Sequence, residues 1–373
     1  MKFSASDNAT SAGFSSINRE NSFDTLRLIS ALFVLLGHAF FLTGQNAPQI
    51  IGIPIHTLGL LNLFVISGYL TTLSWVRNPA FFKYVAKRSL RIFPGLLASL
   101  LFIALVIGPL FTSYSLQSYF SNRYTILFVV RNFALWFDDW LPGVFDGPQF
   151  GGGSDGVLWT LPIEFGLYFT VPILVALASW NRRVAGISIM AAAVALTWLS
   201  MISNYEFHHR IYRINIDSAL EIVPFFFFGA GIAMATNSSW ISRHSIKIGA
   251  FCALILCLAG FAPPNWNYVL GLPLLSSCIV SVGLSRLLYS GSYSRIGDLS
   301  YGIYLIHWPI ESAILSVIGF SVSAWVLGLI ATGLCIPYAW CLWHGVERPA
   351  LALKQRLRSK LQTHEVVEAP HLS

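Results

Sequence analysis

Residues 23–40 read FDTLRLISALFVLLGHAF, an apolar run that contains Arg27 and a lone histidine, His38. Such a run is typical of a membrane-spanning helix, in which ionisable side chains are costly and persist mostly where they do chemistry or transport. Eleven residues bring a helix to within about 20° of its starting direction and raise it by about 16 Å. Arg27 and His38 are therefore predicted to share one helix stripe at different depths, with Asp24 near the same stripe.

The composition of the 373-residue chain indicates an integral membrane protein. Hydrophobic residues make up 55% of it and charged residues 10%, whereas soluble domains usually carry roughly 25% charge. The mean hydropathy is +0.66. We expect an all-α fold, a polytopic membrane helical bundle of about ten transmembrane helices. The predicted spans are 28–43, 57–75, 93–111, 157–177, 184–202, 219–235, 248–261, 269–284, 296–318 and 322–343.

The basic residues predict the orientation of this bundle, because Lys and Arg concentrate in cytoplasmic loops. With the N-terminus inside, ten spans place all but four of the 23 basic residues in inner segments. Both termini are therefore expected to be cytoplasmic. An alternative makes 124–140 an eleventh span, but it would bury Arg131, Asp138 and Asp139 and invert every later basic loop. We interpret 124–140 as an amphipathic or re-entrant element on the outer face.

Three segments are predicted along the chain. Residues 1–22 are polar and read as a disordered cytoplasmic tail, residues 23–349 as the transmembrane domain, and residues 350–373 as a basic cytoplasmic tail. No removable signal peptide is expected. The formal charge of +7 reflects orientation, since the basic residues are spread over inner loops, and no nucleic-acid partner is predicted. The five cysteines fall within or at the edge of the spans and are interpreted as packing residues.

Rare polar groups are predicted to converge near the middle of the membrane. His38 is expected about 16 Å from the inner end of its helix. Glu164 lies seven residues inside a span entered from the outside, and His307 lies about ten residues inside one entered from the cytoplasm. Tyr168 and Tyr304 each lie one turn from one of these groups. The alternative for each group is a polar packing role within the bundle.

A basic cluster marks the cytoplasmic side. Residues 87–94 read KRSLRIFP, in which Arg88 and Arg91 point the same way from a helix that enters the membrane. Guanidinium pairs bind phosphate bidentately, and anionic cytosolic donors would arrive here. Topology and lipid head groups are the alternative explanation for these charges.

Two outer loops carry further polar residues. Glu206, His208 and His209 could suggest a metal, but adjacent histidines point to different sides, so an exposed loop is preferred and no metal site is predicted. An acidic outer loop either contacts a glycan or only links helices; it contains Asp138, Asp139, Asp146, Asp155 and the glycines 151–153. The sequence contains no nucleophile elbow, phosphate-binding glycine loop or zinc pattern.

From about residue 23 to 349, the chain resembles the acyltransferase 3 family of integral membrane O-acyltransferases. Six blocks carry the resemblance in the family's order: the 27–38 helix, FVISGYL at 64–70, the 88–94 segment, 158–172 with Glu164, GDLSYGIYLIHWP at 297–309, and VERP at 346–349. Family members often carry a second acidic residue after the glutamate, whereas Phe165 stands here, and Thr160 and Pro162 also replace commoner residues.

The resemblance implies a ten-helix bundle that takes an acyl group, usually acetyl from acetyl-CoA on the cytoplasmic side, and passes it to a glycan hydroxyl outside the membrane. It marks Arg27, His38, Arg88, Arg91 and Glu164 as functional positions. We hypothesise that His38 either activates the acceptor hydroxyl or briefly carries the acyl group. Arg27 would stabilise charge on the donor or hold its thioester arm, and Arg88 with Arg91 would bind the CoA phosphates.

The remaining expectations concern the substrates. Glu164 would orient His38 or the sugar hydroxyl, His307 and Tyr304 would line the acceptor side, and Asp24 and Tyr168 would also contact substrate. No permanently bound cofactor is expected, and acetyl-CoA would be a substrate. The other partners would be membrane lipids and a glycan or glycolipid, such as exopolysaccharide, O-antigen or lipo-oligosaccharide, at the cytoplasmic (inner) membrane of a bacterium.

Three alternatives stay open. A transporter or flippase of a glycan or lipid-linked sugar would also suit a polar seam, although no internal repeat is evident. A non-catalytic scaffold or receptor gives no reason for three ionisable groups at mid-membrane depth. Within the enzyme class, transfer of succinyl or a longer acyl group is the nearest alternative to acetyl transfer.

Overall fold

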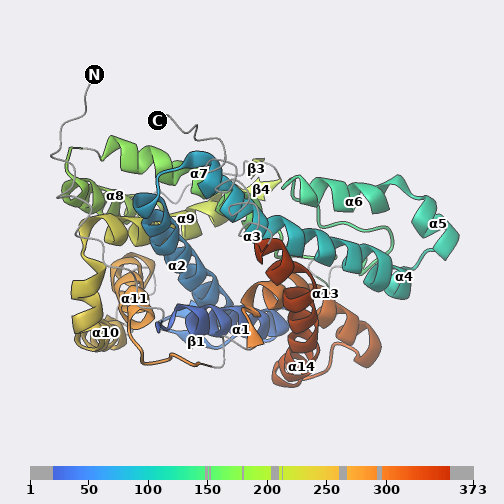
Figure 1. The fold of residues 1–373 in the computed structure, drawn as a ribbon. Coiled ribbons are helices and arrows are strands. Elements are labelled where there is room, and N and C mark those ends of the chain that lie inside the picture. The colour runs from blue at the N-terminus through green and yellow to red at the C-terminus, as the bar shows by residue number, and fades with distance from the viewer. Residues whose placement is uncertain are drawn as a thin grey trace, which may run out of the picture.

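The computed structural model describes residues 20–147, 150, 153–178, 180–202, 210–211, 213–259, 267–291 and 296–352. Helices dominate this part of the chain, and its named strands form two short antiparallel hairpins (Figure 1). The elements are α1 (Phe23–Leu42), β1 (Gln49–Ile50), β2 (Ile53–Pro54), α2 (Ile55–Arg77), α3 (Phe81–Phe102), η3 (Ile103–Ile107, π-helical), α4 (Gly108–Phe111), α5 (Leu116–Ser121), α6 (Arg123–Phe133), α7 (Thr160–Leu177), α8 (Arg182–Ile202), β3 (Arg210–Ile211), β4 (Ile214–Asn215), α9 (Ile216–Ala235), α10 (Ser238–Ala259), α11 (Asn267–Leu284), α13 (Ser300–Ile318), α14 (Ala324–Leu342) and η6 (Trp343–Glu347, π-helical).

The described helices confirm the predicted bundle. Nine of them are long and apolar enough to cross a membrane, and Tyr268–Leu284 is a shorter apolar helix. These ten helices coincide with the ten predicted runs, so the all-α polytopic membrane fold is confirmed. The largest difference in bounds is at α3, which begins at Phe81 and not at residue 93. Its first turns carry Lys83 and Lys87, so the helix begins before the apolar run does.

The stretch 124–140 does not form a span. It gives α6, which has 11 residues and is too short to cross a bilayer. Figure 1 shows α3 and α4 extending away from the other helices, with α5 at the far end and α6 returning beside them. The prediction of a non-spanning element at this position is therefore confirmed.

The core is built around α1, α2 and α13. Helix α1 packs against α2, α13 and α14, and α2 also packs against α9. Helices α2 and α9 approach closely through small residues, because a Cβ added at Gly68 would lie 2.0 Å from the Phe226 carbonyl oxygen. A Cβ at Gly229 would lie 2.4 Å from the Val65 carbonyl oxygen, so both glycines are needed for this crossing.

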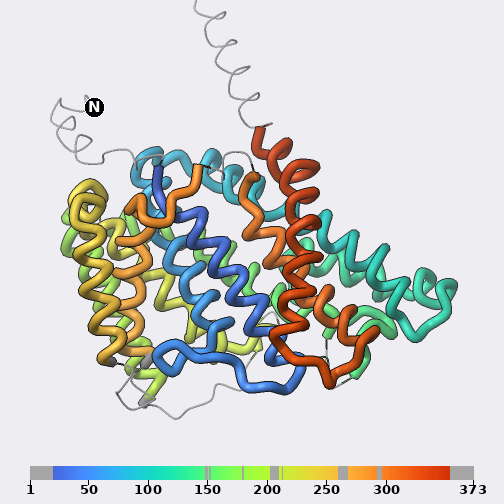
Figure 2. The backbone as a smooth tube through the Cα atoms, turned by 90° about the horizontal axis from the view of Figure 1, so that it is seen from below, coloured from blue at the N-terminus to red at the C-terminus, as the bar shows by residue number. Residues whose placement is uncertain are grey.

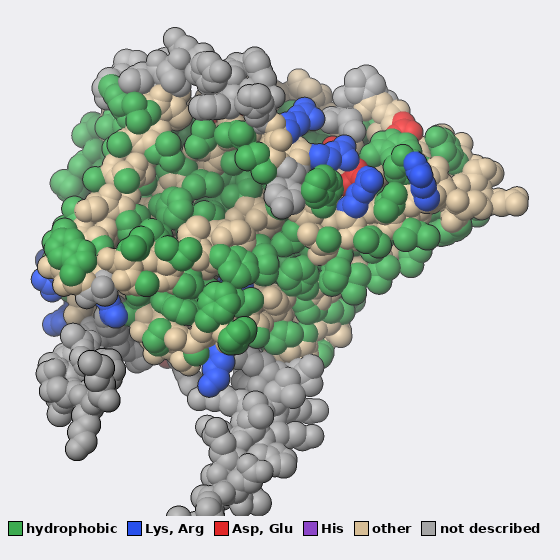
Figure 3. All heavy atoms as spheres, turned by 90° about the horizontal axis from the view of Figure 1, so that it is seen from above, with side chains coloured by type: hydrophobic (Ala, Val, Ile, Leu, Met, Phe, Trp, Pro, Cys, Tyr) green, Lys and Arg blue, Asp and Glu red, His purple; other side chains and the backbone are tan. Residues whose placement is uncertain are grey.

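The two ends of the bundle differ from its sides. Figure 2 shows α1 beginning and α14 ending at the same end of the molecule, as an even number of crossings requires. Figure 3 shows one flank, where hydrophobic side chains cover a broad band and basic side chains gather toward the two ends. Large hydrophobic side chains such as Leu177 and Val317 are more than two-thirds exposed, which suits contact with lipid.

Several predictions lie outside the described residues. These are most of the N-terminal tail (residues 1–19), most of the C-terminal tail (residues 353–373), the glycines at 151 and 152, and the group Glu206, His208 and His209. The proposed tail boundaries therefore stay predictions.

Candidate active site

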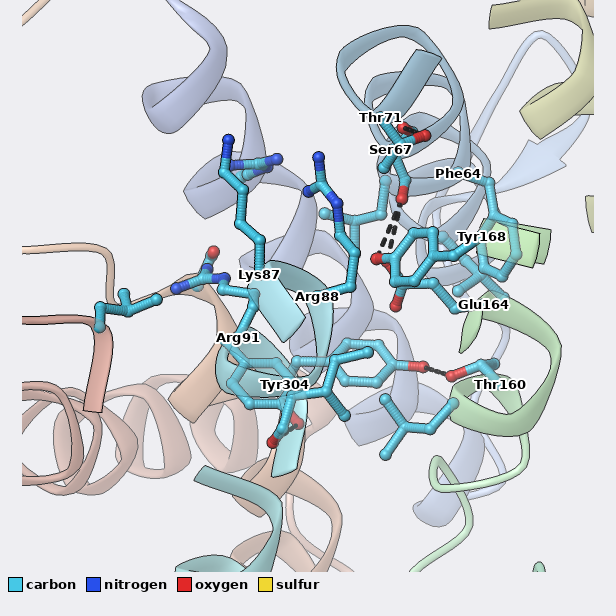
Figure 4. Close-up of a pocket in the computed structure, with 18 residues that line it drawn as sticks. Phe64, Ser67, Thr71, Lys87, Arg88, Arg91, Thr160, Glu164, Tyr168 and Tyr304 are labelled. Carbon is cyan, nitrogen blue, oxygen red and sulfur yellow. Dashed lines mark hydrogen bonds between the residues drawn. The ribbon is translucent and has the colours of Figure 1, made fainter. Parts of the chain in front are cut away.

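A cavity of about 220 Å³ lies between α1, α2, α3, α7 and the start of α13 (Figure 4). It is lined by six of the predicted site residues: Arg27, Arg88, Arg91, Glu164, Tyr168 and Tyr304. Further polar lining comes from Ser67, Thr71, Lys87, Thr160, Ser300 and Tyr301. Arg27 and Lys87 lie near the beginnings of α1 and α3, and Leu351 near the end of the last helix. The cavity therefore lies toward the end of the bundle that the basic residues predict to be cytoplasmic.

Glu164 is held on the wall of this cavity. The Tyr168 hydroxyl donates a hydrogen bond to its Oε1 atom at 2.5 Å, and the Ser67 hydroxyl donates to the same oxygen at 3.0 Å (Figure 4). Phe165, which stands where a second acid is common, packs its ring against Phe93 at 5.3 Å between centroids. The hydrogen-bond partners of the Glu164 carboxylate are thus Ser67 and Tyr168.

Arg91 joins three elements through two carboxylates. Its guanidinium donates to Asp298 Oδ2 at 2.5 Å and to Glu347 Oε2 at 3.1 Å. These contacts tie α3 to η6 and to a residue two positions before the start of α13. Burial opposes ionisation of Asp298, but the charges of Arg91 and Arg27 and hydrogen bonds from Ser300 outweigh it, so the pKa of Asp298 is lowered. Arg91 therefore lines the cavity with its charge already compensated.

Arg27 is paired more loosely at the same end of the cavity. Its Nη1 atom lies 3.7 Å from Asp24 Oδ1 and 4.0 Å from Asp298 Oδ2. Asp24 does not line the cavity, and its side chain is 56% exposed. The predicted contact of Asp24 with substrate stays a prediction, and in the structure its role is to pair with Arg27.

Arg88 differs from Arg91 and Arg27 in its contacts. Its guanidinium carbon lies 5.5 Å from the ring centroid of Tyr84 and 5.6 Å from that of Tyr168. Among the described residues no ion pair with a carboxylate is formed by Arg88. Figure 4 shows Arg88 and Lys87 extending from α3 in the same direction. The two arginines predicted to bind phosphate therefore differ: carboxylates compensate the charge of Arg91, and within the described residues no carboxylate compensates that of Arg88.

The inner limit of the cavity is set where α7 and α13 meet. The hydroxyl of Tyr304, one turn into α13, lies 2.6 Å from the hydroxyl of Thr160 at the first residue of α7. The Tyr304 hydroxyl also lies 3.4 Å from the carbonyl oxygen of Val157, in the loop that precedes α7. This loop therefore enters the bundle, where irregular backbone is tolerated because protein surrounds it.

His38 and His307 form a pair one turn beyond Tyr304. The Nδ1 atom of His38 lies 2.8 Å from the Nε2 atom of His307, and the two rings are parallel with centroids 5.1 Å apart. His307 is fully buried. The pair does not line the cavity, and Glu164 has its hydrogen bonds elsewhere, so the residue that orients His38 in the structure is His307.

The depth of His38 differs from the expectation. Helix α1 begins at Phe23 and ends at Leu42, so His38 lies about 22 Å from its first residue and about 6 Å from its last. The sequence estimate counted from Arg27, four residues after the helix begins. His38 is therefore closer to the predicted outer end of its helix than to the middle.

His56 is a third histidine at this position that the sequence analysis missed. It is the second residue of α2, and its ring stacks on that of His38 with centroids 5.4 Å apart. The contact depends on Gly37, because a Cβ added there would lie 2.5 Å from the Cβ of His56. A glycine directly before the membrane histidine was the available sequence signal for such a close approach.

The loop before α7 also supports the histidines. Trp308 presents its ring edge-on to His38 at 5.1 Å between centroids, and its indole N–H donates to the Gly153 carbonyl oxygen at 3.3 Å. Earlier in this loop Asp138 pairs with Arg131 at 2.6 Å and with Arg213 at 2.8 Å. The acidic loop therefore packs against α13 beside His38, and its contact with a glycan stays a prediction.

Asp155 provides a test of how tightly the loop before α7 is packed into the bundle. It is fully buried, and its Oδ1 atom accepts the backbone N–H of Val157 at 3.2 Å. Burial raises the pKa of Asp155 well above its usual range; the hydrogen bond from Val157 opposes this and the charge of Asp139 adds to it. A raised carboxyl pKa means that the fold binds this proton more tightly than the unfolded chain, so its stabilising effect is lost as pH rises from 3.8 through the folded pKa.

Asp155→Asn is accordingly expected to raise Tm at pH 7 by at least about 2 °C, because the amide keeps the acceptor and removes the titrating proton. Intrinsic-fluorescence melting of the detergent-solubilised protein measures this. The gain in Tm should shrink as the pH falls toward 3.8, the ordinary pKa of an aspartate carboxyl. A lower Tm for the variant at pH 7 would contradict this account of Asp155.

The sequence of the chain matches a known family over most of its length. A family model of the acyltransferase 3 type, described as an acyltransferase domain, matches residues 20–344. The chain belongs to this family. The resemblance inferred from six motif blocks is therefore confirmed, and this acyltransferase is a multi-pass integral membrane protein.

Two curated relatives are similar over nearly their whole length. The acyltransferase is 28% identical over 319 residues to a protein of Shigella phage Sf6 named O-acetyl transferase, covering 81% of this chain and 88% of that protein. It is 30% identical over 372 residues to Nodulation protein 10 of Rhizobium leguminosarum bv. viciae, covering 92% of this chain and 96% of that protein. No solved structure matches the chain.

Proposed function

We propose that this acyltransferase moves an acyl group, acetyl in the first instance, from acyl-CoA at the cytoplasmic face to a hydroxyl of an extracytoplasmic glycan. The observation that carries the proposal is the line of polar residues along α13. Ser300, Tyr301 and Tyr304 line the arginine-rich cavity, and His307, one turn further, hydrogen-bonds His38. A cavity lined by Arg27, Arg88 and Arg91 thus leads toward a histidine pair.

The donor half of the site fits the parts of an acyl-CoA. Arg88, whose charge no carboxylate compensates among the described residues, and Lys87 beside it would bind the CoA phosphates. The Glu164 carboxylate and the Ser67 hydroxyl would accept the amide N–H groups of the pantetheine arm. Arg27, whose ion pairs are long, would attract the donor's negative charge.

The reaction itself is assigned to His38. Imidazole suits proton transfer near neutral pH, and it can also act as a nucleophile. His38 would either remove the proton of the acceptor hydroxyl or carry the acyl group briefly. The hydrogen bond between Tyr304 and Thr160 lies between the cavity and the histidine pair, so the thioester arm would have to displace or pass it.

The acceptor and the location are inferred from the orientation and the relatives. The basic residues favour a cytoplasmic cavity, and His38 then lies toward the outer end of α1. The name of the phage protein supports acetyl as the acyl group and a hydroxyl as the acceptor. The second relative comes from a bacterium, which supports the inner membrane of a bacterium as the location. Exopolysaccharide, O-antigen or lipo-oligosaccharide is the acceptor class that we propose.

A genetic comparison tests the proposal. Surface glycans are purified from a strain without the gene and from strains complemented with the wild type or with His38→Ala, and ester-linked acetyl is measured by proton NMR and by mild alkaline release. We expect acetyl ester only with the wild-type gene. Equal acetyl content in all three strains would refute acetyl transfer to surface glycans. Ester-linked succinate in place of acetate would keep the reaction and change the acyl group.

A further inference from the structure

The proton positions in the histidine pair follow from one contact of His307. Its Nδ1 atom lies 2.9 Å from the carbonyl oxygen of Tyr304 and 3.2 Å from that of Ile303. A carbonyl oxygen can only accept a hydrogen bond, so Nδ1 of His307 must carry a proton. The backbone of α13 therefore fixes which nitrogen of His307 is the donor.

His307 is neutral in this arrangement. Its side chain is fully buried, and no ion pair with a carboxylate is formed by it within the described residues. An uncompensated buried charge is very costly, so the second nitrogen stays unprotonated. In a neutral imidazole with a proton on Nδ1, Nε2 is an acceptor.

This acceptor determines the state of His38. The Nε2 atom of His307 lies 2.8 Å from Nδ1 of His38, so Nδ1 of His38 must donate. The remaining nitrogen of His38, Nε2, then has a free lone pair. The ring is also held by His56, from α2, and by Trp308, from α13. Rigid helices thus fix both the tautomer and the plane of the ring.

We propose that His307 is a positioning residue that holds His38 in the Nδ1–H tautomer, so that Nε2 of His38 is the atom that reacts. This inference rests on the proposed acyl transfer and specifies its proton path. As the acceptor oxygen bonds to the thioester carbonyl carbon, its O–H bond breaks and the proton moves to Nε2 of His38. The C–S bond then breaks, and the same proton passes from Nε2 to the leaving sulfur, which gives the ester and free thiol.

The assignment holds for either proposed role of His38. If the ring carries the acyl group, Nε2 attacks the thioester carbon, the C–S bond breaks and CoA leaves as the thiolate, while the proton on Nδ1 stays in its hydrogen bond to His307. The acceptor oxygen then bonds to the acyl carbon as the bond from Nε2 breaks, and the hydroxyl proton passes to the thiolate. In both cases the positive ring of His38 keeps a hydrogen bond to a neutral acceptor. A carboxylate in place of His307 would add a buried charge whose desolvation is costly.

The kinetic test compares His307→Leu, which removes the acceptor, with His307→Gln, which keeps a side-chain acceptor of similar reach. In purified protein with acetyl-CoA and de-esterified glycan, we expect His307→Leu to lower kcat at least about 100-fold while KM for acetyl-CoA changes less than twofold. His307→Gln should recover part of this loss. Ser312→Ala, at an equally buried residue of α13, is the matched control and should keep the wild-type kcat.

A spectroscopic test decides the tautomer without activity. The nine histidines are labelled with ¹⁵N in the intact protein, and the His38 signals are assigned by their loss in His38→Ala. Long-range ¹H–¹⁵N correlation should show the proton of His38 on Nδ1 in the wild type, and loss of this single form in His307→Leu. A proton on Nε2 in the wild type, or an unchanged kcat in His307→Leu, would overturn the inference. Absence of acetyl transfer by the wild type would instead refute the proposed function.

Discussion

His38→Ala is expected to lower the rate of acyl transfer by about 10²–10⁴-fold, the range that a positioned acid–base group typically contributes. The reason is geometric. His38 is the only histidine of the pair whose second nitrogen is left free by the hydrogen bonds of the described residues, since His307 uses both of its nitrogens. Without the His38 ring, the pair has no nitrogen left that can accept the proton of the hydroxyl, because His307 uses both of its own.

The measurement is release of free thiol from acetyl-CoA by purified protein with the glycan acceptor present. His244→Ala is the matched control, because His244 lies on α10 and its hydrogen bond among the described residues stays within that helix, to the Trp240 carbonyl oxygen at 3.0 Å. Size-exclusion profiles show whether each variant is folded. A His38→Ala protein with the control's elution volume and a wild-type rate would remove His38 from the mechanism.

The second large effect distinguishes Arg88 from Arg91, two arginines that the sequence predicts to have the same role. Arg88→Ala is expected to raise KM for acetyl-CoA by at least about tenfold, since a charged hydrogen bond to phosphate contributes about 1.5–3 kcal/mol. The folded yield should not change, because no carboxylate within the described residues depends on Arg88. Arg88→Lys keeps the charge, so its KM for acetyl-CoA should lie between those of the wild type and Arg88→Ala.

Arg91→Ala should act on folding first. It removes the partner of Glu347 and the nearer of the two arginines that pair with Asp298, and breaking a buried ion pair costs about 3–5 kcal/mol. We expect a clear loss of folded protein and a lower Tm, measured in parallel with KM on whatever protein remains folded. If both variants raised KM equally at unchanged Tm, the arginines would share the phosphate and the division drawn from the structure would be wrong.

The sequence predicted the helices well because crossing a membrane imposes a length and a composition on each one. It also predicted that Arg27 and His38 share a stripe, and both do face the α13 segment, through Asp298 and His307 respectively. The rotation of about 100° per residue within one helix is enough to predict which of its side chains share a stripe. It does not give the neighbouring helix, so the pairing of His38 with His307 could not be derived.

The missed residues have the same cause. Asp298 and Glu347 stood in recognised motif blocks without a role, and their contact with Arg91 joins residues more than 200 positions apart. His56 lies two residues after Pro54, at the start of an apolar run, and reads as a helix-end residue until Gly37 brings it beside His38. Ser67 became a partner of Glu164 only once α2 and α7 were placed together.

Transfer across the membrane is the central claim, and sealed proteoliposomes test it most directly. Acetyl-CoA with a radiolabelled acetyl group is added outside vesicles that contain de-esterified glycan in their lumen. The protein is inserted so that the start of α1 and the end of α14 face outward. We predict alkali-labile label on the enclosed glycan with the wild type and none with His38→Ala. Label that appears only when donor and glycan share one compartment would contradict an acyl group passing from the arginine-rich cavity through the bundle to the outer face.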